Sequence, residues 1–358
     1  MARPSRRSRG SVTIEDVARA AGVSAMTVSR VMNGEKNVRD STREAVREAI
    51  ERLKYTPNTA ARSLAAGQAT HIGLLYANPS DAYLSQFLVG ALEGARRAGC
   101  HLVIEACEYE DEAEQAEAAR RFATTQVEGV ILPPPLSESV PILTELAAAE
   151  MPVVTVAMGH LYENALNIRI DDFAAAAEMT HYLLGLGHRR IGLIKGFPTH
   201  IASIERERGF KAALEAGGVD PSEAPIEQGY FTFRSGLTAA ERLLDLPDPP
   251  TAIFASNDDM AAAAVSVAHR RGLGVPDDIS IVGFDDTAPA TTVWPELTTV
   301  RQPVSAMAEA ALDLLLADLR GRRSGVAAGP AERVLEHELV IRESSGPAAR
   351  LPKARRSA

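Results

Sequence analysis

Residues 13–32 of the chain read TIEDVARAAGVSAMTVSRVM, and this stretch decides how the first part of the molecule folds. It divides at Gly22 into two short helical patterns, because glycine readily adopts the positive φ that a tight turn between helices requires. Ala18 is the small residue expected where the two helices touch. The apolar positions of the inner face are Val17, Ala21, Val23, Val28 and Val31. Together these features predict a helix-turn-helix rather than an ordinary helical hairpin.

A third helical segment, STREAVREAIERL at 41–53, completes a compact head over residues 11–57. Hydroxyl side chains stand where the three helices are expected to begin, at Thr13, Ser24 and Ser41. A serine or threonine there accepts a hydrogen bond from an otherwise unpaired backbone N–H. Thr13 is followed by Asp16 at the spacing of a capping box.

Charge is distributed unevenly along the chain. Residues 1–68 contain 13 Lys+Arg and 7 Asp+Glu, a net charge of +6, which leaves −15 for the remainder of a chain with a net charge of −9. A basic head on an acidic body indicates a polyanionic partner for the head alone. Residues 1–10 carry four arginines, which form either a solvated, disordered tail or a weak, sequence-independent phosphate contact.

From residue 70 the pattern changes to apolar strands alternating with helices, which predicts parallel sheets. The expected strands of a first lobe are 72–77, 101–107, 129–133 and 152–157, and those of a second lobe are 189–196, 252–256 and 279–284. A helix at 304–319 and one long strand at 333–344 follow both lobes. We therefore expect a two-lobed body over residues 70–343, in which the chain passes between the lobes more than once. Residues 344–358 are expected to be a disordered tail.

Composition excludes several classes of protein. With 46% hydrophobic and 24% charged residues in 358, no apolar run long enough to span a membrane and no signal peptide, the chain is expected to be globular and cytoplasmic. Its two cysteines, Cys100 and Cys107, are expected to be buried free thiols. The motifs GxSxG, GxxxxGK[ST] and HExxH are absent, which argues against the enzymes that carry them.

We expect neither a metal nor a cofactor. The acidic pairs 171–172, 258–259 and 285–286 suggest Mg²⁺ at first sight, but consecutive side chains point in different directions. His181 and His188 lack an evident third ligand and are expected at the surface.

The head resembles that of the lactose and galactose repressor family of bacterial transcription regulators. The similarity is carried by VTIEDVARAAGVSAMTVSRVMNG at 12–34 and TREAVREAIERLKYTPNTAARSLA at 42–65, and it extends to about Glu343. It implies that residues 24–32 form a recognition helix in the major groove. Arg30 can bond guanine, whereas Ala25 and Met26 offer apolar contact to a thymine methyl group. The implied DNA-binding residues are Thr13, Ser24, Ala25, Met26, Thr27, Ser29, Arg30, Asn33 and Leu64.

Residues 58–69 read as a linker that can also form a short helix. The resemblance implies a hinge helix that folds on the operator, with Leu64 of each copy wedged into the minor groove to kink the DNA. The alternative is a linker leucine packed on the body. Two heads that bind together imply a homodimer on a near-palindromic operator.

The body resembles the effector domain of the same family, a type I periplasmic-binding-protein-like fold. Ligands of such folds bind beyond the carboxyl ends of the strands, and strand-end position together with the resemblance selects Tyr83, Pro133, Arg206, Phe231, Asn257 and Asp285. These side chains suit a sugar, as expected of a repressor of carbohydrate uptake or catabolism. Ala157 stands where many sugar-binding members have an acidic residue, and three prolines at 133–135 replace more polar choices, so an oligosaccharide, a glycoside or a non-sugar metabolite stays open. An inducing and a co-repressing effect also both stay open, because either needs only different affinities for two states. An enzyme or a periplasmic sugar-binding protein is the remaining alternative.

Overall fold

The computed structural model describes residues 13–32, 38–53, 70–159, 166–325, 329 and 331–348. The chain divides into two compact units, Met1–Ala69 and Thr70–Ala358. Asn33, Leu64, residues 1–12 and the segment 54–69 lie outside the described residues, and so do the predictions made for them.

The first unit is the predicted helix-turn-helix, extended by a third helix: α1 (Ile14–Ala21), α2 (Ala25–Met32) and α3 (Asp40–Leu53). Gly22 ends α1 with φ of 67°, as the turn requires. The buried side chains that join the three helices are Val17, Ala18, Val28, Val31, Val46 and Ala49. The N-caps expected at Thr13 and Ser24 are present. The prediction that Ser41 caps the third helix was wrong, because α3 begins one residue earlier, at Asp40, and Ser41 lies within the helix.

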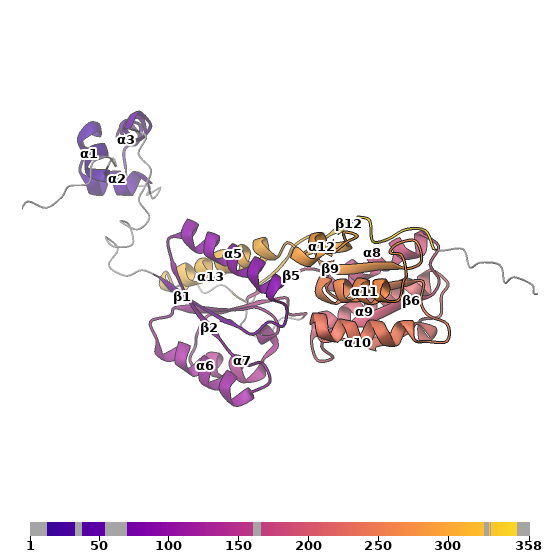
Figure 1. The fold of residues 1–358 in the computed structure, drawn as a ribbon. Coiled ribbons are helices and arrows are strands. Elements are labelled where there is room, and N and C mark those ends of the chain that lie inside the picture. The colour runs from indigo at the N-terminus through magenta and orange to yellow at the C-terminus, as the bar shows by residue number, and fades with distance from the viewer. Residues whose placement is uncertain are drawn as a thin grey trace, which may run out of the picture. The chain divides into compact units, whose positions relative to one another are not determined.

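The first lobe of the body is a parallel six-stranded sheet in the order β11-β5-β4-β3-β1-β2 (Figure 1). Its strands are β1 (His71–Tyr76), β2 (His101–Ala106), β3 (Gly129–Leu132), β4 (Val153–Val156), β5 (Leu166–Arg169) and β11 (Ala331–Val334). Its helices are α5 (Asp81–Ala98), α6 (Glu112–Thr124), the short η1 (Leu136–Glu138), α7 (Val140–Ala148) and α13 (Val304–Arg323).

The second lobe has the order β12-β10-β9-β8-β6-β7, and only the β10–β12 pair is antiparallel. Its strands are β6 (Ile191–Lys195), β7 (Ile226–Gln228), β8 (Ala252–Ala255), β9 (Ser280–Asp285), β10 (Thr298–Arg301) and β12 (Glu338–Val340). Its helices are α8 (Asp172–Gly185), α9 (Ile201–Ala216), η2 (Pro221–Glu223), α10 (Phe233–Leu244), α11 (Asp258–Arg270) and α12 (Ala288–Thr292).

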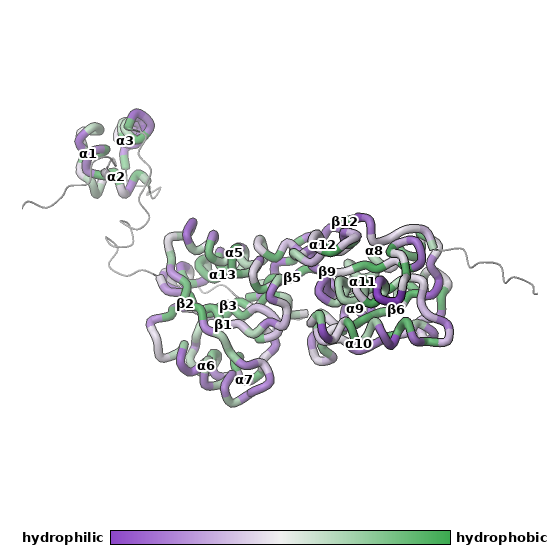
Figure 2. Tube along the Cα trace, in the orientation of Figure 1, coloured by the Kyte–Doolittle hydropathy of each residue, from purple (hydrophilic) through white to green (hydrophobic). Residues whose placement is uncertain are grey.

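Between its described elements the chain passes from one lobe to the other three times: from β5 to α8, from β10 to α13, and from β11 to β12. This confirms the expectation of more than one crossing. The single strand predicted at 333–344 was wrong, because residues 335–337 leave the first sheet and the chain pairs again in the second. The apolar central strands of each sheet, such as β1 and β3 in Figure 2, supply the cores of the lobes.

The C-terminal segment is ordered further than the sequence suggested. Ser344 is fully buried, donates its hydroxyl to the Ile281 carbonyl (2.5 Å) and accepts the N–H of Thr298 (2.9 Å). Residues 344–348 therefore belong to the body, which corrects the expected start of the tail, and residues 349–358 lie outside the described residues. Cys100 and Cys107 are free and buried, as predicted. None of the helices in the described part of the chain combines the length and hydrophobicity needed to cross a lipid bilayer.

Candidate functional site

Helix α2 presents the residues predicted to read DNA. Burial of Val28 and Val31 turns the opposite face outward, and Met26 on that face is 66% exposed. The Met26 side chain lies outside the core of the head and is available to contact a partner. Ser29 and Arg30 follow Met26 at helical spacing and lie on the same side of the helix.

Two of the predicted DNA-binding hydroxyls already hold the helices in place. The Thr13 hydroxyl donates to Asp16 Oδ2 (2.7 Å), and Ser24 Oγ accepts the N–H of Thr27 (3.2 Å). The hydrogen bonds from Thr13 keep the pKa of the Asp16 carboxyl below its usual value. Residues 13–32 and 38–53 contain six basic and six acidic side chains. The basic excess of the head therefore comes from the segments that flank the helices.

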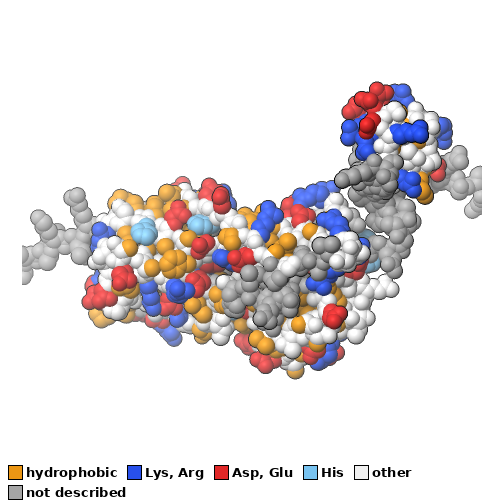
Figure 3. All heavy atoms as spheres, turned by 180° about the vertical axis from the view of Figure 1, so that it is seen from behind, with side chains coloured by type: hydrophobic (Ala, Val, Ile, Leu, Met, Phe, Trp, Pro, Cys, Tyr) orange, Lys and Arg blue, Asp and Glu red, His pale blue; other side chains and the backbone are white. Residues whose placement is uncertain are grey.

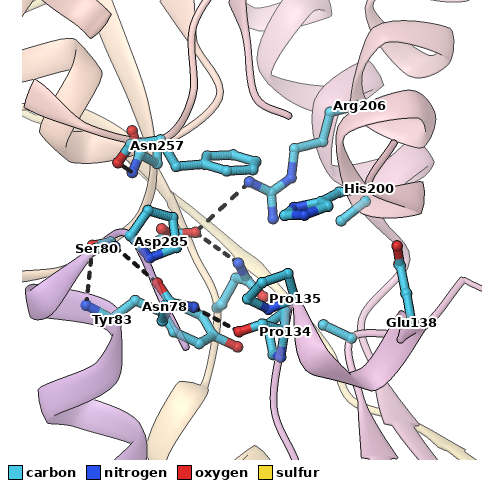
Figure 4. Close-up of a pocket in the computed structure, with 15 residues that line it drawn as sticks. Asn78, Ser80, Tyr83, Pro134, Pro135, Glu138, His200, Arg206, Asn257 and Asp285 are labelled. Atoms are coloured by element: carbon cyan, nitrogen blue, oxygen red, sulfur yellow. Dashed lines mark hydrogen bonds and ion pairs between the residues drawn. The ribbon is translucent and has the colours of Figure 1, made fainter. Parts of the chain in front are cut away.

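A cavity of about 60 Å³ lies between the two lobes of the body (Figure 4). Five of the six predicted effector residues line it: Tyr83, Arg206, Phe231, Asn257 and Asp285. Pro133 does not, because it is buried directly after β3, and Pro134 and Pro135 line the cavity in its place. The other lining residues include Asn78, Ser80, Glu138, Ala157, His200 and Gln302.

Arg206 on α9 is held rigidly at the back of this cavity. Its side chain is 4% exposed, donates Nε–H to Asp172 Oδ1 (2.8 Å) and Nη1–H to the Ser256 carbonyl (2.5 Å), and lies over the Phe284 ring at 3.6 Å. Asp285 at the end of β9 lies 3.8 Å from Arg206 Nη1 and accepts the side-chain amide of Gln302 (2.7 Å). Burial raises the pKa of Asp285 to about 7, despite the nearby guanidinium.

Two polar atoms in the lining have no hydrogen-bond partner among the described residues: the Tyr83 hydroxyl and Gln302 Oε1. Both are buried, and leaving such a group unpaired costs about 1–3 kcal/mol. Burial also raises the pKa of Tyr83, so this hydroxyl keeps its proton. The cavity thus offers one donor and one acceptor that a polyhydroxylated ligand can satisfy.

Backbone strain is concentrated around the same cavity. Five non-glycine residues in the described segments have positive φ; Ala157 (60°), Phe231 (58°) and Asp285 (107°) line the cavity, and Asp286 (56°) follows directly. Such conformations cost on the order of 1–3 kcal/mol each and are typical of functional sites.

Sequence reasoning missed two side chains that join the lobes. Glu138, which follows β3 at the end of η1, accepts the N–H of Ile201 with both carboxylate oxygens (3.2 Å each). It thereby caps α9, whose own N-cap residue, His200, makes no side-chain cap. His200 bonds through Nε2 to the Tyr109 hydroxyl of the first lobe (2.9 Å). Burial raises the pKa of Glu138 to about 7 and lowers that of His200 to about 4. Only a wider search of the strand-end loops could have found them.

The paired acids are engaged in hydrogen bonds and ion pairs. Asp258 accepts from Thr287 and Thr299, Asp259 accepts from Ser80 (2.5 Å), and Asp286 pairs with Arg301 and Arg342. Among the residues that the structure describes, no group of three or more His, Cys, Asp or Glu is placed to hold a metal ion. His188 is buried, contrary to expectation, because it bonds Thr251, Ser280 and the Gly346 carbonyl.

Two family models match the chain. Residues 13–58 match the model described as bacterial regulatory proteins, lacI family, and residues 180–345 match a periplasmic binding protein-like domain. Similar curated proteins are the HTH-type transcriptional regulator DegA of Bacillus subtilis, 34% identical over 94% of this chain and 98% of its own length, and the HTH-type transcriptional regulator CelR of Thermobifida fusca, 34% identical over 93% and 98%.

Solved structures agree with these matches. A transcriptional regulator CelR–cellobiose complex superposes with a TM-score of 0.71 at 32% identity, covering 93% of this chain and all of that one. The lac repressor dimer bound to operator and an anti-inducer gives 0.68 at 28% identity, covering 94% and 100%. The predicted fold class, a helix-turn-helix head with a two-lobed body of mostly parallel sheets, is thereby confirmed.

Proposed function

Because the chain belongs to the lacI family of bacterial regulatory proteins, we propose that it represses genes of carbohydrate uptake or catabolism, with a sugar in the cleft changing its affinity for the operator. It is a ligand-responsive, DNA-binding transcription regulator. The observation that carries the sugar proposal is the cavity itself, where Arg206, Asp285 and Asn257 surround unpaired polar atoms of Tyr83 and Gln302.

The charges of the cavity favour an uncharged sugar. Arg206 is already paired with Asp172 and lies close to Asp285, while Glu138 adds a further carboxylate to the lining. A carboxylate or phosphate on the ligand therefore meets more negative than positive charge in a poorly solvated space, which is unfavourable. Hydroxyl groups can donate to Asp285 and Gln302 Oε1 and pair with the Tyr83 hydroxyl.

In the head, the proposed DNA contacts come from the outward face of α2. Arg30 reads a guanine, Ala25 and Met26 contact thymine methyl groups, and Thr13, Ser24, Thr27, Ser29 and Asn33 contact phosphates or neighbouring base edges. Leu64 is proposed as the minor-groove wedge. Figure 3 shows acidic and basic side chains interspersed over the visible face of the body, which offers DNA no continuous basic surface there. We place this activity in the cytoplasm.

A homodimer on a near-palindromic operator fits the surface of the first lobe. Val103 and Ile104 on the edge strand β2, and Val89 and Leu92 on α5, are exposed large apolar side chains on two elements that contact each other. Exposed apolar side chains that share one side of a helix, such as Val89 and Leu92, are typical of protein interfaces, whereas Val103 and Ile104 point to opposite faces of the sheet edge. A second copy of the chain is the proposed partner. The similar lac repressor structure is described as a dimer.

The head assignment is tested by Arg30→Ala in gel shifts on operator and on random DNA. A lost guanine contact costs about 1–3 kcal/mol, so the preference for operator should fall roughly tenfold to a hundredfold. Arg19→Ala is the matched control, since Arg19 is exposed on α1 and pairs with Asp16. Equal losses on both DNAs would reduce Arg30 to a phosphate contact. The effector proposal is tested by repeating the operator titration with and without sugars.

A further inference from the structure

A series of aromatic rings leads from the cavity to the protein surface. Phe231 and His200 line the cavity, with ring centroids 6.0 Å apart and an interplanar angle of 19°. Phe197 stacks on His200 at 4.8 Å, and Tyr230 meets the edge of Phe197 at 5.2 Å. Phe, Trp and Tyr form only 5% of this chain, so three of them gathered around His200 at one edge of the cavity are not accounted for by composition.

The outer end of this series is open to solvent. Tyr230 is 44% exposed, although it directly precedes the strained, cavity-lining Phe231. Gly196 makes the inner end possible, because any Cβ there would collide with the Phe231 ring. Phe197 and His200 follow strand β6, which ends at Lys195, and Tyr230 and Phe231 follow strand β7, which ends at Gln228. The rings are therefore carried by two strand-end loops of the second lobe. In this structure Tyr109 of the first lobe also packs edge-on against Phe197 and His200.

The cavity is too small to hold a sugar without movement of the residues at its rim, where the two lobes meet. The cavity volume of about 60 Å³ is far below the ~300 Å³ of a typical ligand pocket. A sugar must therefore part the contacts that join the lobes at the rim, namely His200 with Tyr109 and Glu138 with Ile201. Phe197 contacts both the His200 and the Tyr109 ring at this point, and the exposed Tyr230 contacts Phe197 in turn.

We propose that the effector is an uncharged sugar of at least two rings. This rests on the proposed sugar-responsive function and specifies the class of sugar. The inner ring lies among Arg206, Asp285 and Phe231, and the second ring stacks on the outer platform, which is the exposed ring of Tyr230 set edge-on against Phe197. An aromatic face suits the apolar C–H side of a sugar ring, and the polar edges of that ring stay in water. The outer platform then sets the length of sugar that the protein recognises.

The test measures binding of monosaccharides and matching disaccharides to the full-length protein by calorimetry: glucose with cellobiose and maltose, xylose with xylobiose, mannose with mannobiose, and galactose with galactobiose. We expect at least one disaccharide to bind roughly tenfold or more tightly than its monosaccharide. Tyr230→Ala should lower that disaccharide's affinity about threefold to tenfold and leave any monosaccharide affinity unchanged. Tyr230→Phe keeps the ring and should bind as the wild type does.

Phe233→Ala is the matched control. Phe233 lies three residues after Tyr230, is equally exposed at 45%, and takes no part in the ring contacts recorded among the described residues. Its removal should leave both affinities unchanged. A monosaccharide that binds as tightly as its disaccharides, or a Tyr230→Ala protein with full disaccharide affinity, overturns the second-ring platform and leaves the sugar-responsive function intact. Failure of every sugar to bind overturns that function, and this inference with it.

Discussion

Asp285 joins the charged and polar parts of the cavity, since it lies beside Arg206 and accepts from Gln302. Asp285→Asn keeps the shape but weakens its bonds to ligand hydroxyls. Hydrogen bonds to a charged group contribute about 1.5–3 kcal/mol, so effector affinity should fall roughly tenfold to a hundredfold in calorimetry, with effector-free operator binding unchanged. Asp286→Asn is the control, because Asp286 pairs with Arg301 and Arg342; it should lower the melting temperature only. Full effector response in Asp285→Asn would exclude Asp285 as a ligand residue.

Glu138 should make stability depend on pH. Its pKa rises from 4.5 to about 7 through burial, so between these values the folded protein binds a proton that the unfolded chain does not. Stability from this group is therefore lost as pH rises from about 4.5 to 7. Glu138→Gln removes the titration and should stabilise the protein at pH 8 by about 1–3 kcal/mol relative to wild type, with little difference at pH 5.

The measurement for Glu138→Gln is the melting temperature at both pH values. Glu145→Gln serves as its control, because Glu145 pairs with Arg120 outside the cavity. Its small effect should be the same at pH 5 and pH 8. Melting curves of Glu138→Gln that follow those of the wild type at both pH values would show that burial of this carboxyl has little energetic effect.

Individual residues of the effector cavity could be predicted from the sequence only where a motif or the end of a strand marked their position. Arg206, Asn257 and Asp285 satisfied that condition, and Phe231 followed from the family resemblance. Glu138 was not predictable in this way, because its role depends on the N-terminus of α9, 63 residues later in the chain. His188 similarly becomes buried only through partners that follow it by 63 to 158 residues.

At the scale of elements, α5 and α13 approach each other closely at Gly90. An added Cβ there would lie 2.6 Å from the Ser305 Cα, which is backbone and cannot move aside. Gly90→Ala should therefore destabilise the protein by about 1–3 kcal/mol, although alanine normally favours a helix. Gly94→Ala is the matched control one turn later, where the nearest atom to the Cβ belongs to the Leu312 side chain at 3.1 Å and the nearest backbone atom, the Glu309 Cα, is at an ordinary 3.6 Å. The free energies of unfolding of both variants are measured with a denaturant. Equal values for Gly90→Ala and Gly94→Ala would contradict the close backbone contact.

Apolar runs revealed most central strands, but short polar strands were missed. The strand β10 begins with Thr298 and Thr299, which are fully buried because their hydroxyls bond the Arg342 carbonyl and Asp258. Asn167 in β5 is buried in the same manner and donates to the Met158 carbonyl. Their sequence reads as surface, since each polar group is satisfied by a partner that only the tertiary fold supplies.

For the whole molecule, the three crossings tie the lobes into one body, since β11 and β12 complete different sheets from a single C-terminal segment. Neither sheet is complete without that segment. A sugar that changes how far the two lobes close therefore moves parts of one connected body. The first strand of that body, β1, begins at His71, shortly after the 58–69 segment. That segment is the covalent link between the body and a head that has its own core.

Coupling of this kind is reciprocal. If the sugar changes operator affinity by some factor, saturating operator must change sugar affinity by the same factor and in the same direction. We expect a factor of about 5 to 150, measured at one fixed salt concentration, because DNA affinity depends steeply on salt. Asp285→Asn should lower sugar affinity equally with and without operator, whereas Arg30→Ala should leave sugar affinity unchanged in the absence of DNA. If the sugar binding measured by calorimetry is indifferent to operator while operator binding responds to sugar, the two experiments report different binding events, and the sugar acts on DNA binding from a site other than this cavity.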